Sequence, residues 1–203
     1  AIGQDALLMQ DAGAHAYNVA IGHEAGKAVT TGVENVLIGG LAGDVLTTGQ
    51  YNVVMGTNAL SNEDTGSRNT AIGHYALNAL NYNGAAYNTA VGFWAGLSLT
   101  SGAYNTVIGG LAGDALTTGA GNVAIGYLAL STEDSGGSNV AVGHSALKDQ
   151  DAGDAYNTAL GYHSGKSVTT GVQNTIIGGL AGDALTTGNY NIAIGHTALS
   201  TED

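Results

Sequence analysis

The sequence predicts an all-β protein: a parallel β-solenoid, or β-roll, of about twelve 17-residue rungs with two short strands in each rung. Two observations lead to this fold class. An asparagine recurs at intervals of 17 residues along most of the chain, and glycine makes up 34 of the 203 residues while proline and cysteine are absent. A short fixed period means that each repeat is one turn, which buries its apolar side only by stacking on neighbouring turns.

The repeating asparagine defines position 1 of each rung and sets the register of the chain. Its side-chain amides are expected to form a structural ladder, bonding to one another along the stack. The asparagines of this ladder are Asn18, Asn35, Asn52, Asn69, Asn88, Asn105, Asn122, Asn139, Asn157, Asn174 and Asn191.

Two recurrent glycines mark the corners of each rung, where the backbone needs a positive φ or a close approach. One is at position 15, as in Gly32 and Gly102. Between the corners, positions 1–4 and 10–14 are rich in Val, Ile, Leu and Thr, which favour strands. The position 5 corner glycines are Gly22, Gly39, Gly56, Gly73, Gly92, Gly109, Gly126, Gly143, Gly161, Gly178 and Gly195.

A longer period lies on top of the rung period. Four rung types alternate in fixed order, and super-repeats begin at residues 18, 88 and 157. The fourth type is longer than 17 residues. We therefore expect residues 1–203 to be one continuous repeat domain, and to be a slice of a longer array because neither end carries a capping element.

The side-chain pattern suggests which positions face inward. Position 4 is always Ile, Val, Leu or Met, which predicts one buried column (Ile21, Ile38, Met55, Ile72, Val91 and Ile108). Position 8 is almost always alanine, so two layers should approach closely there. Position 3 should point outward, yet it is also apolar. This predicts a self-association face covered by a second copy of the chain, with Leu37, Val107 and Ile176 as its largest members.

The charge of the chain and the length of its apolar runs argue against nucleic acid and membrane insertion. Sixteen acidic residues against four basic ones give a net charge of −12, which argues against nucleic acid as a partner. No apolar run is long enough to insert into a membrane. Lysines at position 10 precede aspartates one rung later, which predicts axial ion pairs between Lys27 and Asp44 and between Lys166 and Asp183.

Side chains that carry chemistry are present without a recognisable arrangement. Histidines at positions 6 and 7 share their column with Phe93 and Tyr127, which indicates an exposed corner rather than a metal site. The acidic pairs Glu63-Asp64, Glu133-Asp134 and Glu202-Asp203 suggest a solvated acidic edge, although Asp151 follows one rung after Asp134 and a calcium site is conceivable. We predict no catalytic residue, no metal site and no cofactor.

The runs NTAVGFWAGLSLTSGAY and NTIIGGLAGDALTTGNY resemble the 17-residue repeats of bacterial and phage tail-fibre-domain proteins. They are also similar to the AIG-containing head repeats of trimeric autotransporter adhesins. The resemblance covers essentially the whole chain. It implies a left-handed parallel β-roll that is often trimeric.

The expected function follows from this resemblance and from the repeat. We expect a non-enzymatic structural segment of an extracellular or virion-surface fibre that self-associates, as a trimer or end to end. One alternative is a phage tail-fibre shaft, an adhesin-like rod that presents receptor-binding corners. Another is a solenoid that binds ice through adjacent threonines such as Thr30-Thr31, or a cell-surface glycan.

Overall fold

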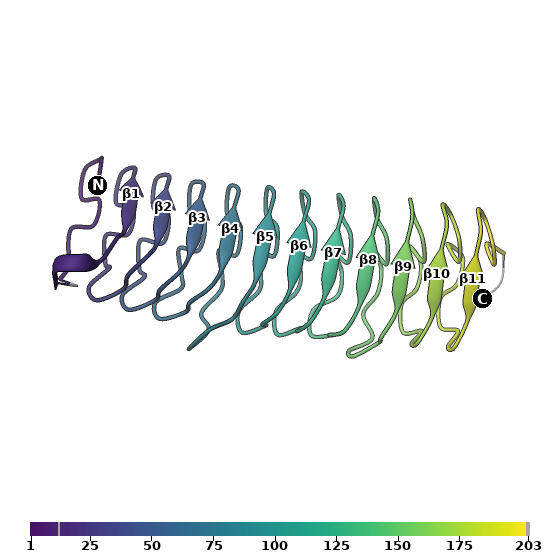
Figure 1. Cartoon of the computed structure of the whole chain (residues 1–203). Helices are drawn as coiled ribbons and strands as arrows, with labels where there is room; N and C mark the ends of the chain where they lie inside the picture. The colour runs from purple at the N-terminus through teal and green to yellow at the C-terminus, as the bar shows by residue number, and fades with distance from the viewer. Residues whose placement is uncertain (12, 202–203) are drawn as a thin grey trace.

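The computed structural model describes residues 1–11 and 13–201, and the predicted acidic pair Glu202-Asp203 therefore lies outside the described residues. The chain forms a rod in which eleven short strands stand side by side, with the two termini at opposite ends (Figure 1). The predicted parallel β-solenoid is confirmed. The described part of the chain contains no helix long and apolar enough to cross a membrane.

All eleven strands belong to one parallel sheet in sequence order. Each strand covers positions 2–4 of its rung and pairs with the next strand one full rung later, for example Ile21 with Ile38. Ile2 forms a further parallel bridge to Ile21, and a short 3-10 helix, η1 (Gly13–His15), precedes the sheet. The strands are β1 (Val19–Ile21), β2 (Val36–Ile38), β3 (Val53–Met55), β4 (Thr70–Ile72), β5 (Thr89–Val91), β6 (Thr106–Ile108), β7 (Val123–Ile125), β8 (Val140–Val142), β9 (Thr158–Leu160), β10 (Thr175–Ile177) and β11 (Ile192–Ile194).

The second strand predicted in each rung does not form. Positions 10–14 are turns and bends in the described residues. This segment still bonds to the next rung through alternate backbone N–H groups, as in Ala28 to Asp44 (2.9 Å) and Thr30 to Thr47 (2.9 Å), which continue the bond from Gly26 at position 9 to Ala42 (2.9 Å). The conformation is irregular because positions 7 and 9 both adopt positive φ, which folds the backbone into successive turns after the corner.

The interior of the solenoid is lined by position 3, and the predicted buried column at position 4 is wrong. Leu37, Val107 and Ile176 are at most 1% exposed, whereas Ile21 is 39% and Leu160 47% exposed. Successive side chains of a strand point to opposite faces, so burying position 3 turns positions 2 and 4 outward. The predicted self-association face at Leu37, Val107 and Ile176 is therefore wrong as well, because these side chains form the core.

Alanine suits the interior because a 17-residue rung encloses a narrow space. Position 8 alanines such as Ala42 and Ala112 are fully buried opposite the strand, as expected. Position 12 supplies the larger core side chains, including Leu46, Leu99 and Leu116. Mostly small residues at positions 3 and 8 let the two sides of each rung approach closely.

Two of the four rung types differ in how large and small residues share this core. Type two rungs place a large residue at position 3 and glycine at position 9, whereas type four rungs place alanine at position 3 and leucine at position 9, as in Ala71 and Leu77. An ideal Cβ at Gly43 would lie 3.0 Å from Leu37 Cδ2, and one at Gly182 would lie 3.2 Å from Ile176 Cγ2. In these two rungs the large residue at position 3 therefore requires glycine at position 9.

Candidate functional site

The asparagine ladder runs along the inside of the rod and links each rung to the next. The backbone N–H of each asparagine donates to the Oδ1 of the preceding one, as in Asn105 to Asn88 (2.9 Å). The Asn105 Nδ2 also donates to Asn88 Oδ1 (3.2 Å) and to the carbonyl of the corner glycine Gly119 (2.8 Å). The amides are buried and their hydrogen bonds lie within the chain, so the ladder is placed to stabilise the stack and not to meet a ligand.

The corner glycines differ in what they require. At position 5 the backbone has positive φ and also approaches the next rung: Gly109 has φ of 133°, and an ideal Cβ there would lie 2.6 Å from the carbonyl oxygen of Gly126. At position 15, Gly102 has ordinary φ, but a Cβ would lie 2.6 Å from Leu99 Cδ1. The first corner needs glycine for conformation and space, and the second for space alone.

Two glutamates of the predicted acidic edge are in fact buried in the core column at position 12. Glu63 and Glu133 are both fully buried, and this part of the prediction is wrong. Glu63 Oε1 accepts from the Gly66 N–H (2.7 Å) and Oε2 from the Tyr82 N–H (2.8 Å). Burial raises the pKa of the Glu63 carboxyl, against the opposing effect of these backbone donors.

Each buried glutamate anchors the longer rung that follows it. Glu133 Oε1 accepts from the Gly136 N–H (2.7 Å), and its Oε2 accepts from Gln150 Nε2 (3.0 Å) and from the Ala152 N–H (3.3 Å). Tyr82 and Ala152 both lie in type four rungs, where inserted residues bulge from the rod. The glutamates therefore satisfy backbone donors that the insertion would otherwise leave buried and unpaired.

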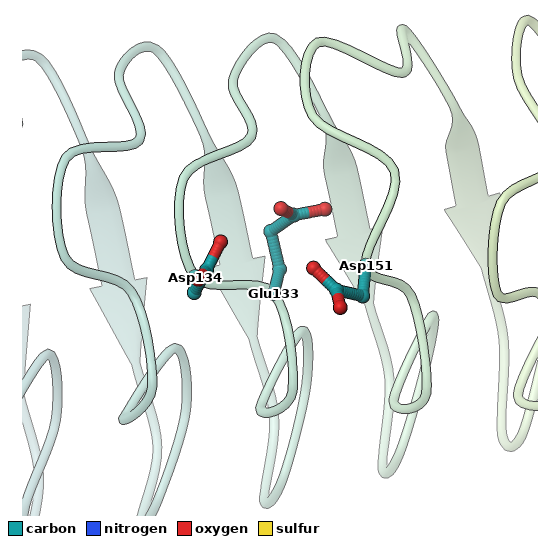
Figure 2. Close-up of side chains that lie close together, drawn as sticks. All are labelled: Glu133, Asp134 and Asp151. Atoms are coloured by element: carbon teal, nitrogen blue, oxygen red, sulfur yellow. The ribbon is translucent and has the colours of Figure 1, made fainter.

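Glu133, Asp134 and Asp151 form the one acidic group in the described residues whose ligand atoms all lie within 4.8 Å of one another (Figure 2). Asp134 and Asp151 are exposed on adjacent rungs. Both oxygens of Glu133 already accept hydrogen bonds from protein donors, so this residue is placed as an internal anchor. The conceivable calcium site thus reduces to two exposed carboxylates beside a buried one that is already satisfied.

Comparison with protein-family models, with curated proteins and with solved structures finds no match for this chain. The function must therefore be argued from the molecule itself.

The outer face of the sheet is mainly apolar and carries no charge. Positions 2 and 4 of all eleven strands are Val, Ile, Leu, Met or Thr, and they are half-buried or exposed in the single chain. The sheet therefore has an outer face with mainly apolar residues, but positions 2 and 4 form it and not position 3 as predicted. We call these 22 outward side chains of β1–β11 the outer sheet face.

Exposed aromatic side chains flank the outer sheet face at both edges. At position 17, just before each asparagine, Arg68 lies over the rings of Tyr51 (5.1 Å) and Tyr87 (5.6 Å), and Tyr87 stacks on Tyr104 (5.7 Å). At positions 6 and 7, just after the glycine corner, rings stack along the rod. Sequence reasoning identified the second edge as an exposed corner but missed the first, although the tyrosines recur there at the rung period.

The remaining sequence-predicted contacts are arranged differently from expectation. Lys27 pairs with Glu24 of its own rung (3.0 Å), and within the described residues no salt bridge joins Lys27 to Asp44 or Lys166 to Asp183. Instead, the Oδ1 atoms of Asp44, Asp114 and Asp183 are each buried without a hydrogen-bond partner. Burial raises the pKa of the Asp44 and Asp114 carboxyls.

The threonine hydroxyls at position 13 and the hydroxyl of Ser145 are engaged within the chain. The position 13 hydroxyls donate to the carbonyl of the next rung, as in Thr47 to Asp64 (3.0 Å) and Thr117 to Asp134 (2.9 Å). Ser145 Oγ lies 3.0 Å from Nδ1 of the adjacent His144, but Ser145 is only 3% exposed. A serine nucleophile must be reachable by its substrate, so this pair does not have the geometry of a nucleophile and base.

Proposed function

We propose that this chain is a structural, non-enzymatic segment of an extracellular fibre and that it self-associates through the outer sheet face. The observation that carries the proposal is the uniformity of that face. Eleven consecutive rungs present two outward Val, Ile, Leu, Met or Thr side chains with no charge between them, in a chain of net charge −12. Contiguous apolar patches of this extent mark interaction surfaces.

A second copy of the chain is the partner that fits best. Another copy presents the same face with the same rung spacing, so outward side chains of two rods interdigitate along their whole length. The face spans roughly 50 Å by 10 Å, or about 500 Å² per chain, from the usual strand spacing and rise. Two such faces bury about 1,000 Å², which is the lower bound for a specific interface, and the flanking tyrosines and Arg68 add residue types enriched in interfaces.

The acidic charge is consistent with selective contact. The outer sheet face itself holds no charged residue, although Arg68 and Glu34 lie at its edge, so repulsion between rods favours approach through that face over other orientations. Whether the fibre belongs to a cell surface or to a virion depends on what the rod is attached to. The same face would serve either one.

Sedimentation velocity of the whole chain tests the proposal. We expect a discrete oligomer or filament for the wild type and a monomer for Ile108→Lys combined with Ile125→Lys, two outward residues on neighbouring strands β6 and β7. Thr118→Lys adds the same charge type at an exposed position outside the sheet and should leave association unchanged. Circular dichroism confirms that each variant is folded. A wild-type chain that remains monomeric at high concentration would contradict the proposal.

A further inference from the structure

The only tryptophan and the only phenylalanine of the chain lie on its surface, side by side. Phe93 is 51% and Trp94 37% exposed, although residues of these types are usually buried. Their rings stack at 4.9 Å, and Phe93 also stacks on His74 of the preceding rung (5.5 Å, nearly parallel). With Tyr75, which meets His74 edge-on at 4.5 Å, these residues form what we call the aromatic platform: His74, Tyr75, Phe93 and Trp94.

The surroundings of the aromatic platform are polar but uncharged on one side. Asn78 Nδ2 donates to Ser61 Oγ (2.6 Å) and to the Asn58 carbonyl (3.0 Å), and Asn62 Nδ2 donates to the Asn78 carbonyl (2.8 Å). Asn58 occupies the same column as Tyr75 and Trp94, one rung earlier. A band of amides and a hydroxyl therefore runs up to the edge of the rings.

A partly exposed carboxylate, that of Asp114, lies on the other side. Position 10 is adjacent to position 7, as the bond from the Leu97 N–H to the Trp94 carbonyl shows (3.2 Å). Asp114 occupies position 10 on the next rung, where its backbone carbonyl accepts from Ser98 (3.1 Å). The Asp114 Oδ1 is buried without a hydrogen-bond partner, as it also is in Asp44 and Asp183, but the side chain as a whole is partly exposed and offers a carboxylate to a ligand.

The middle super-repeat departs from the other two at this place. At positions 6, 7 and 10 of the type one rung it has Phe93, Trp94 and Leu97, where the first has His23, Glu24 and Lys27. The third super-repeat has His163 at position 7 and Lys166 at position 10. The charge at position 10 is thus replaced by an apolar residue in the same rung that gains the large rings.

We propose that the aromatic platform is a binding site for a neutral glycan. The C–H groups on one face of a pyranose ring pack against the negative face of an aromatic ring, while the sugar hydroxyls donate and accept at the rim. The amide band at Asn78 and the carboxylate of Asp114 are two rungs apart, about 10 Å by the strand spacing, so a disaccharide lying along the rod reaches both. Positions 6, 7 and 10 of the two rungs that carry the rings hold no lysine or arginine, and in a chain of net charge −12 this favours an uncharged sugar.

This inference does not depend on self-association, and the chain has a built-in probe for it. Trp94 is the only tryptophan, so its fluorescence reports on the aromatic platform alone. Titration of the whole chain with cellohexaose and chitohexaose should give a saturable change for at least one of them, and oligomers of the acidic sugar polymer alginate should bind more weakly. Isothermal titration of Trp94→Ala should show binding weakened about tenfold or more, and Asp114→Asn should weaken it to a smaller degree.

Tyr162→Ala is the matched control because Tyr162 occupies the position of Phe93 in the third super-repeat, and it should bind as the wild type does. The absence of a saturable signal with both neutral sugars, or unchanged affinity in Trp94→Ala, would overturn the inference. If the sugars do not bind and Trp94→Ala instead changes the sedimentation of the chain, the aromatic platform belongs to the interface between copies and the glycan site is wrong.

Discussion

Glu133 and Gln150 occupy the same core column on adjacent rungs, and Gln150 Nε2 donates a 3.0 Å hydrogen bond to Glu133 Oε2 inside the rod. Both side chains are fully buried where most other rungs place leucine or valine. Removing a buried acceptor while its donors stay in place costs more than the lost hydrogen bonds alone, because the donors remain buried without a partner.

We therefore expect Glu133→Leu to destabilise the chain although it restores the residue type of the column. The Gly136 and Ala152 N–H groups and the Gln150 amide would lose their acceptor, at a cost of about 2–4 kcal/mol. Chemical denaturation measures the difference. Asp134→Asn, a change at the exposed neighbouring carboxylate, should fall within about 0.5 kcal/mol of the wild type. Equal stabilities for the two variants would show that the glutamate anchors nothing.

Stability should rise as the pH falls from neutrality toward 4.5, in part because of Glu63. Burial raises the pKa of this carboxyl in the folded state above its ordinary value of 4.5. The folded chain then binds a proton more tightly than the unfolded chain, so the stabilisation is fully present below the ordinary pKa and is lost as the pH rises through the folded-state pKa. Denaturation midpoints measured across this range should show the trend in the wild type and a weaker one in Glu63→Gln. Parallel curves would exclude Glu63 as the source.

Gly109→Val should be strongly destabilising. A valine there must adopt φ near 133°, with its Cβ 2.6 Å from the carbonyl oxygen of Gly126, so a loss above about 3 kcal/mol is expected. Ala103, the variable position 16 of the neighbouring rung, would be a poor control because it is buried. Ala120, at the same position one rung later, is exposed, and Ala120→Val should change stability by less than about 0.5 kcal/mol. Similar melting temperatures for the two valine variants would argue against a conformational requirement for the corner.

The sequence predicted the stacking of rungs well because the period is a global property of the chain. It could not decide which face of the strand is inside, because stretches such as Val36-Leu37-Ile38 are apolar at every position and carry no alternation. A useful signal was available elsewhere: the rungs with the largest residues at position 3, Leu37 and Ile176, have glycine at position 9. The buried glutamates were missed because acids are normally exposed, although Glu63 falls in the column of Leu46 and Leu80. The ring stacking that builds the aromatic platform depends on side-chain rotamers, which the repeat pattern does not specify.

The exchange of bulk between positions 3 and 9 gives the sharpest test of the core. Gly43→Leu alone should destabilise the chain, because the new side chain enters the space held by Leu37, whose Cδ2 lies 3.0 Å from an ideal Cβ. Overpacking of this kind costs about 1–3 kcal/mol. Leu37→Ala alone should cost about 2–5 kcal/mol through the cavity that it leaves.

Combining Leu37→Ala with Gly43→Leu should recover part of both losses, because the double variant recreates the Ala71 and Leu77 arrangement of the type four rung. The backbone already permits it: Gly43 has φ of 55° and Leu77 has φ of 49°. Recovery should be incomplete because Leu37 also fills the space beside Gly26 on the preceding rung. A double-mutant cycle by chemical denaturation measures the coupling, with Ile38→Ala on the outer sheet face in place of Leu37→Ala as the control pair. Additive losses in the Leu37 cycle, or equal coupling in the Ile38 cycle, would mean that the four-rung period does not arise from core packing.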